Sequence, residues 1–294
     1  MITSPYLEGR DRYERSMEGW VDNTHDDAFT HTVRLGDDDA SVQVEMVCTP
    51  SPGYEVRQSA ARTLFGSVDP SAVEGFGRLG GARMVAGFGR RLTEVAGRGQ
   101  GSRLLVDAGI EVARLARQTA KFPREATLGL AAGGARACWD LDTTGWIDLP
   151  GSCFTYSDAG RALFETRQVS SPMVADLYSP PPGARRIFVR RKTMRLERAG
   201  ARLDLFHSMH DNVHGFDLRI ALDLEAGTVT TAESQTSRLP YQGICTEPQS
   251  RLASLVGQPA DGALRKRIQT LLGGQSGCAQ LYDLTADLLK LLSF

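Results

Sequence analysis

The chain has 294 residues, of which 41% are apolar, and it carries 34 basic and 35 acidic side chains. It is long enough for one large domain or two of ordinary size, so disorder over most of its length is excluded. The even balance of charge offers no general attraction to nucleic acid or to an anionic membrane, and we expect neither as a partner.

The termini and the cysteines indicate a cytoplasmic protein. No stretch approaches the roughly 20 apolar residues that span a membrane, and residues 1–5 lead into charged sequence without an apolar signal core. The five cysteines are an odd number, lie far apart and include no C-x-x-C pair. We therefore expect reduced thiols, without a disulfide framework or a zinc ribbon.

Residues 1–169 are predicted to form a first α+β repeat. Period-two alternation over 41–47 is typical of a strand. A glycine-rich, basic insert follows over 67–88. Residues 89–115 then read as a basic helix, a glycine-rich stop and a second helix with apolar positions every three or four residues. The extra segment 121–169 is expected to cap the sheet or cover a pocket.

Residues 170–185 are the predicted linker, because three consecutive prolines within them cannot form regular structure. The second α+β repeat is predicted over 186–294. It carries strand-like sequence over 216–222 and 228–232, and it ends in another helix–glycine–helix pattern over 265–291.

The two helix–glycine–helix patterns align without a gap. The matched positions are Arg91 and Arg267, Gly97 and Gly273, Gly101 and Gly277, Leu105 and Leu281, Asp107 and Asp283, and Leu115 and Leu291. This similarity predicts a tandem duplication of an antiparallel β-meander plus helices, in a pseudo-twofold, two-repeat architecture. A sheet covered by helices on one face leaves its other face to bury, so a homodimer is expected.

Four short motifs follow one another in the second half: Arg190–Arg195, Phe206–Asp211, Leu239–Cys245 and Gly277–Asp283. In their order and spacing they resemble a bacterial family known only as a domain of unknown function, whose members read R-R-x-T, F-R-D-S-H, L-P-W-x-E-C and C-T-H-L-N-D. The resemblance is strongest over 190–291, and the first half is similar to a degenerate first copy. Gln280 replaces the histidine of the last motif and Ile244 replaces an acid, which implies a lost or changed activity if that histidine is needed.

The order of strand, loop cysteine, helix and late cysteine also resembles the topology of iron–sulfur scaffolds. Scaffold members use three cysteines and a fourth ligand, whereas only Cys245 and Cys278 match here, so cluster assembly is not expected. The resemblance implies that these two thiols lie near each other. They could act as nucleophiles or contact a ligand if a positive neighbour lowered their pKa, and the alternative is a pair of buried, inert thiols.

The densest group of titratable side chains is His207, His210, Asp211 and His214. On a helix the three histidines would share one face and could bind zinc. Sequence ahead of a strand is more typical of extended chain, and the alternative is a polar turn that His210 and Asp211 cap. We predict no metal and no cofactor.

Glu94 lies on the basic helix directly after the insert, beside Arg90 and Arg91. If the insert lines a cavity, this carboxylate could transfer protons while arginines hold a substrate carboxylate. A salt bridge on the helix surface is the alternative. The G-x-G-x-x-G pattern of 75–80 follows no clear strand and lacks the acidic residue of a nicotinamide site, so that site is rejected.

The leading hypothesis is a small-molecule enzyme of specialised or catabolic metabolism, with acid/base catalysis in a pocket between the two repeats. Its reaction would be a cyclising condensation of an amine with an aldehyde, of the Pictet–Spengler type, or a lyase step. The catalytic candidates are Glu94, His210 and Asp211, and the substrate-binding candidates are Arg83, Arg90, Tyr241, Cys245 and Cys278. The alternative is a non-catalytic protein that binds a ligand or metal, or serves in assembly.

Overall fold

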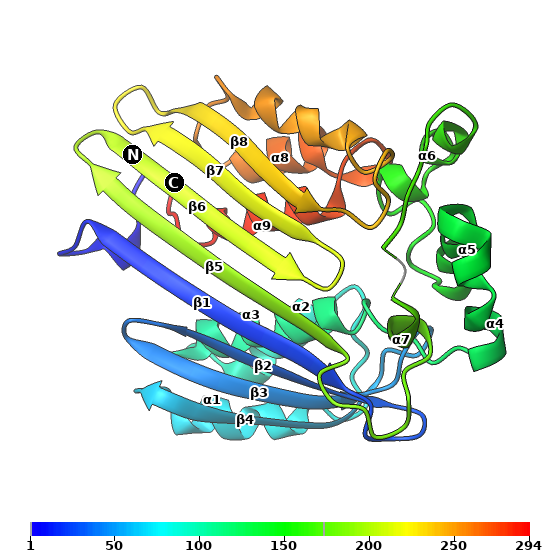
Figure 1. Cartoon of the computed structure of the whole chain (residues 1–294). Coiled ribbons are helices and arrows are strands. Elements are labelled where there is room, and N and C mark those ends of the chain that lie inside the picture. Colours follow the sequence, from blue (N-terminus) through cyan, green and yellow to red (C-terminus); the bar gives the residue numbers. More distant parts are fainter. Residues whose placement is uncertain (1, 173) are drawn as a thin grey trace. The chain divides into compact units, whose positions relative to one another are not determined.

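The computed structural model describes residues 2–172 and 174–294, with the side chains of 131 and 132 excepted. The protein is a mixed α+β chain built on an eight-stranded antiparallel sheet in the order β4-β3-β2-β1-β5-β6-β7-β8 (Figure 1). The strands are β1 Arg12–Asp22, β2 Phe29–Asp37, β3 Ala40–Cys48, β4 Val56–Gly66, β5 Phe188–Ala199, β6 Arg202–Asp211, β7 Gly215–Asp223 and β8 Thr228–Arg238.

Helices follow each run of four strands. They are α1 Pro70–Gly75, α2 Phe88–Ala96, α3 Ser102–Leu115, α4 Arg124–Leu128, α5 Leu130–Gly145, α6 Asp158–Ala162, α7 Ala175–Tyr178, α8 Leu264–Leu272 and α9 Ala279–Leu289. Short 3₁₀ turns occur at η1 Pro5–Leu7, η2 Phe76–Leu79, η3 Phe154–Tyr156, η4 Leu163–Glu165, η5 Glu247–Leu255 and η6 Gly274–Ser276. Within the described ranges, no helix has both the length and the apolar character needed to cross a membrane.

The chain divides into two compact units. We call Arg15–Ala131 with Val174–Arg191 the N-terminal unit, and Met1–Glu14 with Ala132–Met173 and Lys192–Phe294 the C-terminal unit. Most of the extra segment therefore belongs to the C-terminal unit, while the three prolines of the linker belong to the N-terminal one.

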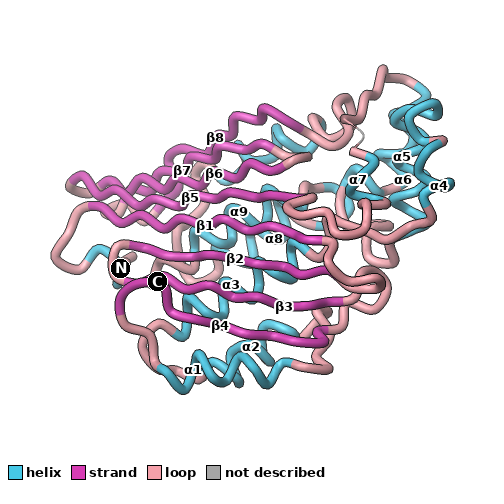
Figure 2. The backbone as a smooth tube through the Cα atoms, turned by 60° about the horizontal axis from the view of Figure 1, so that its bottom comes forward, coloured by secondary structure: helices cyan, strands magenta, loops and turns pink. Residues whose placement is uncertain are grey.

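In the N-terminal unit, α2 and α3 lie on one face of β2–β4 (Figures 1 and 2). Every second side chain of β3 is buried under α3, including Val42, Val44 and Met46, as the alternation of a half-buried strand requires. The two helices approach closely at Gly109 of α3, where a Cβ atom would lie 2.5 Å from Leu92 of α2. Packing of these apolar stripes holds the unit together.

In the C-terminal unit, α9 packs on β6 and α8 packs on α9 (Figure 1). Leu203, Leu205, His207 and Met209 are the buried, alternating side chains of β6. The Nδ1 atom of His207 lies 2.9 Å from the carbonyl oxygen of Leu284 in α9. Because a carbonyl only accepts, this nitrogen carries the hydrogen, and His207 links strand to helix as a hydrogen-bond donor.

The predicted α+β class, the strand-like segments and both helix–glycine–helix patterns are confirmed. The segments 41–47, 216–222 and 228–232 lie within β3, β7 and β8, and the helical patterns form α2 with α3 and α8 with α9. The single-turn helix α7, inside the predicted linker, has no counterpart among the predicted elements. The three prolines themselves lie outside helices and strands, as expected.

Candidate functional site

Three of the predicted binding residues gather in the C-terminal unit around Asp142 of α5. The Asp142 Oδ2 atom accepts a hydrogen bond from the Tyr241 hydroxyl at 2.5 Å and another from the Tyr156 hydroxyl at 2.8 Å. Asp142 is 5% exposed and Tyr241 is 1% exposed. Two phenols on one buried carboxylate oxygen form a charge-assisted network that joins the extra segment to the loop after β8.

Thiols lie beside this carboxylate network. The Cys245 Sγ atom is 3.0 Å from the Thr155 hydroxyl, and Cys278 precedes the first turn of α9. Burial raises the pKa of Cys245 to about 12 and that of Cys278 to about 11. Burial also raises the pKa of Cys153, and a charge on any of the three thiols would oppose a charge on another. The thiols are therefore neutral at physiological pH, a state that does not support nucleophilic catalysis.

The histidine-rich motif forms a strand end and a tight turn, as the structural alternative predicted. The buried Asp211 Oδ1 atom accepts hydrogen bonds from the backbone N–H groups of Val213 and His214, at 2.7 and 2.6 Å. The exposed His210 Nε2 atom lies 3.2 Å from Asp217 on the neighbouring strand. Among the described residues, no group of three or more His, Cys, Asp or Glu side chains could hold a metal ion.

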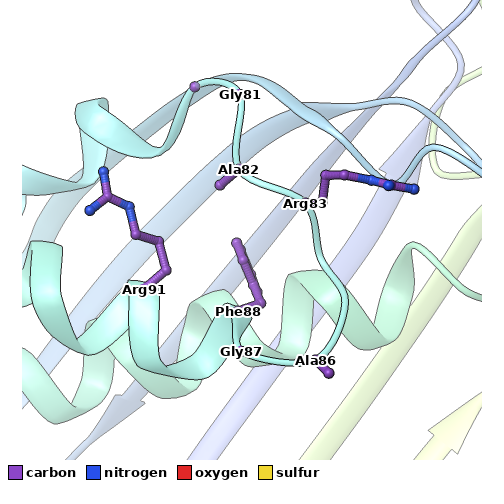
Figure 3. A pocket seen from close by; sticks show the side chains of 8 residues that line it. Gly81, Ala82, Arg83, Ala86, Gly87, Phe88 and Arg91 are labelled. Atoms are coloured by element: carbon purple, nitrogen blue, oxygen red, sulfur yellow. The ribbon is translucent and has the colours of Figure 1, made fainter.

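The glycine-rich insert lines an open pocket of about 450 Å³ in the N-terminal unit, as Figure 3 shows. Arg83 and Arg91 line it together with Phe88, but the Arg83 guanidinium donates to the carbonyl oxygens of Gly53 and Pro52, at 2.9 and 3.0 Å. Arg91 is the arginine that points toward the insert in this view.

Glu94 and Arg90, two of the predicted site residues on α2, are both exposed and are not part of the pocket lining. Glu94 forms a surface ion pair with Arg91 at 3.4 Å, the geometry of the salt-bridge alternative. The catalytic roles given to Glu94, His210 and Asp211 stay predictions.

A second pocket in the N-terminal unit, of about 220 Å³, brings together polar groups from three distant segments. Its lining consists of Asn23, Thr24, His25 and Asp26 after β1, Lys121 and Phe122 after α3, and Ser179, Pro180, Pro182 and Gly183 of the linker. We call it the Asn23–Lys121 pocket. It has space for about seven water molecules at roughly 30 Å³ each, the volume of a small organic molecule.

Lys121 is the titratable group whose protonation this pocket perturbs. Its Nζ atom donates to the Asn23 Oδ1 atom and, at 2.7 Å, to the His25 carbonyl oxygen, and it lies 4.5 Å from the centre of the Phe29 ring. Burial lowers the pKa of this amine, while the carboxylates of Asp26 and Asp27 act in the opposite direction.

Asn23 is itself fixed by the linker. Its side-chain nitrogen donates to the carbonyl oxygens of Pro180 and Pro181, at 3.0 and 2.9 Å, which turns the side-chain oxygen toward Lys121. Its backbone N–H donates to Ala184 at 2.7 Å, and its carbonyl oxygen accepts from Gly183 at 2.8 Å. The linker therefore positions one wall of the pocket.

Neither Lys121 nor Asp142 was among the predicted site residues. Composition was one available signal for Lys121, because lysine is rare in this chain. Only four of its 34 basic residues are lysines, and Lys121 follows the end of a predicted helix. No comparable signal marks Asp142, since its hydrogen-bond partners Tyr156 and Tyr241 lie 14 and 99 positions away along the chain.

Comparison with known proteins relates one part of the chain to a protein family. No curated protein and no solved structure matches the chain. Residues 192–292 match a family described as a protein of unknown function, DUF2889. The matched residues include Tyr241, Cys245 and Cys278 but not the Asn23–Lys121 pocket. Over this C-terminal third, the chain is similar to the DUF2889 family.

Proposed function

We propose that the protein is a small-molecule enzyme that works by acid/base catalysis, without an organic cofactor, in the Asn23–Lys121 pocket. The observation that carries the proposal is that Lys121, an amine with a lowered pKa, lines a pocket beside His25 and Asp26. A cavity with converging polar groups and a perturbed amine is typical of catalytic sites. The pocket is formed within the N-terminal unit alone.

The chemistry of this group suits carbonyl compounds. A lysine amine with a lowered pKa has a larger neutral fraction that can accept protons, and a histidine and a carboxylate can transfer them to and from a substrate oxygen. The reactions proposed are a cyclising condensation of an amine with an aldehyde, which releases one water, or a lyase step beside a carbonyl group. Both need proton transfers and no redox partner.

We also propose the tandem duplication expected from the sequence. Helices α2 and α8 have nine residues each, and each is followed by a glycine-rich turn and a longer helix. Matched positions are buried in both copies: Leu92 and Ile268, Leu105 and Leu281, Val112 and Leu288. In each copy a buried cation of the first strand pairs with an acid of the second helix, Arg15 with Asp107 at 2.8 Å and Lys192 with Asp287 at 3.7 Å. A homodimer and a cytoplasmic location stay predictions.

The test is a screen of uncharged aldehydes, amines and aromatic acids, first by thermal shift and then by product detection. Aldehydes should raise the melting temperature of the wild type but not of Lys121→Met. Lys266→Met, the same change on the exposed face of α8, is the matched control and should behave as the wild type. Indifference to every compound, or equal shifts in both variants, would contradict the proposal.

The second candidate is a non-catalytic binding or assembly protein, which the C-terminal unit favours. Tyr241 is fully buried against Asp142, and the thiols of Cys245 and Cys278 carry raised pKa values. None of these three groups is prepared for proton transfer or nucleophilic attack at neutral pH. A ligand that stabilises the wild type and the Lys121→Met variant equally, with no product formed, would favour this second function.

A further inference from the structure

We infer that Lys121 is a covalent catalyst that forms an imine with a small, uncharged aldehyde in the Asn23–Lys121 pocket. This inference rests on the proposed function and deepens it by naming the nucleophile and the substrate class. Four observations support it. Two concern the amine, namely the number of its hydrogen-bond acceptors and the absence of an ion pair to it within the described residues. Two concern the pocket lining, namely its apolar residues and the negative charge of Asp26.

Two protein oxygens accept hydrogen bonds from the Lys121 amine, which leaves one position of the nitrogen open to the pocket. A neutral amine has two N–H groups and one lone pair, and the amine has two oxygen acceptors, Asn23 Oδ1 and the carbonyl oxygen of His25. The Asn23 amide cannot turn to offer its nitrogen, because that nitrogen donates to Pro180 and Pro181. In this neutral form both N–H groups donate hydrogen bonds, and the lone pair of the nitrogen is available to react.

The carboxylates of Asp26 and Asp27 oppose loss of the Lys121 proton, but two features of the structure weaken their effect. In the part of the chain that the structure describes, no carboxylate forms an ion pair with it. Asp27 is held by Arg57 through two bonds of 2.5 and 2.6 Å, so its charge is largely compensated. Lys192 and Lys290, in contrast, both pair with Asp287, at 3.7 and 2.8 Å.

The pocket lining indicates the substrate class. Phe122, Pro180 and Pro182 offer apolar surface to a ring or a short alkyl chain. Asp26 is the carboxylate of the lining, and the lining contains no arginine that could hold a substrate carboxylate. An uncharged aldehyde therefore fits better than an oxo acid.

The covalent step balances without an oxidant or a reductant. The Lys121 nitrogen attacks the carbonyl carbon, a C–N bond forms and the C=O π bond breaks. The nitrogen then loses one proton and the oxygen takes one, which gives a neutral carbinolamine. A second proton transfer to that oxygen breaks the C–O bond, water leaves, and the nitrogen loses its remaining proton to give the imine. His25 and Asp26 are the lining groups that can transfer these protons.

The experiment is reductive trapping on the full chain. The protein is treated at pH 7 with benzaldehyde and sodium cyanoborohydride, and the labelled lysines are mapped by peptide mass spectrometry over time. The exposed Lys266 is the internal reference, so the result does not depend on a variant that folds. Because a lowered pKa increases the neutral, reactive fraction of an amine, we expect Lys121 to be labelled several times faster than Lys266.

Five outcomes decide the inference. Faster labelling of Lys121 by benzaldehyde than by glyoxylate supports both the nucleophile and the substrate class. Labelling of Lys121 no faster than Lys266 overturns the inference, and faster labelling by glyoxylate overturns the substrate class. If benzaldehyde still raises the melting temperature in a Lys121-dependent way without labelling it, the imine is wrong while the proposed function stands. If benzaldehyde neither binds nor labels, both are wrong.

Discussion

Replacement of His31 by leucine should remove a large part of the acid sensitivity of the fold. His31 lies in β2, opposite Val21 of β1 and Met46 of β3, and it is 1% exposed. Burial lowers its pKa from 6.5 to about 4, while backbone groups of Met46 and Phe29 act in the opposite direction to a lesser extent. Within the described residues, neither ring nitrogen has a partner in ordinary hydrogen-bond geometry.

The sign follows from proton linkage. Between pH 6.5 and about 4 the unfolded chain binds a proton at His31 that the folded chain does not bind. The stability that depends on a neutral His31 is therefore fully present above pH 6.5 and is lost as the pH falls to about 4. The folded and unfolded pKa values of His31 differ by about 2.5, which lowers the free energy of unfolding by about 3 kcal/mol at pH 4.

The assay is urea unfolding followed by circular dichroism at pH 7, 6, 5 and 4. At pH 7 the His31→Leu variant should be as stable as the wild type or more stable, because an apolar side chain replaces a buried ring without partners. At pH 4 it should have lost about 3 kcal/mol less than the wild type. Equal pH dependence in His31→Leu and the wild type would refute the reasoning.

Two further predictions concern the C-terminal unit. The Tyr241→Phe variant should lower the free energy of unfolding by about 2 kcal/mol and Tyr156→Phe by about 1 kcal/mol, because the first hydroxyl is fully buried on Asp142 and the second is half-buried. Urea titration measures both, and a reversed order would contradict this assignment. The Gly277→Ala variant should cost more than about 2 kcal/mol, because its Cβ atom would lie 1.9 Å from a backbone carbonyl oxygen. Gly262→Ala, in open space, is its control, and equal melting temperatures of the two variants would argue against the close contact.

The helices could be predicted because their signal is local. In α3 the apolar side chains recur every three or four residues, and the two glycines of the turn between α2 and α3, Gly97 and Gly101, carry positive φ angles. The first strand of each run was harder to find. Arg15 in β1 and Lys192 in β5 are buried cations at positions where an alternating pattern requires apolar residues.

The candidate site could not be predicted in the same way, because tertiary contacts assemble it. Asn23 and Lys121 are 98 positions apart, and Asp142 and Tyr241 are 99 positions apart. No spacing rule connects residues at such separations, and a single sequence carries no record of which positions vary together. The cysteine motifs drew attention to Cys245, whereas the raised pKa of its thiol depends on burial that only the fold supplies.

The most direct test of the account is the titration of the Lys121 amine by NMR in protein that carries ¹³C-labelled lysine. The chain has four lysines, so substitution of each in turn assigns its signal. We predict that Lys121 titrates below the ordinary lysine value of 10.5 and that its signal shifts when benzaldehyde is added. A titration at or above 10.5, together with no response to benzaldehyde, would contradict the catalytic role of this pocket.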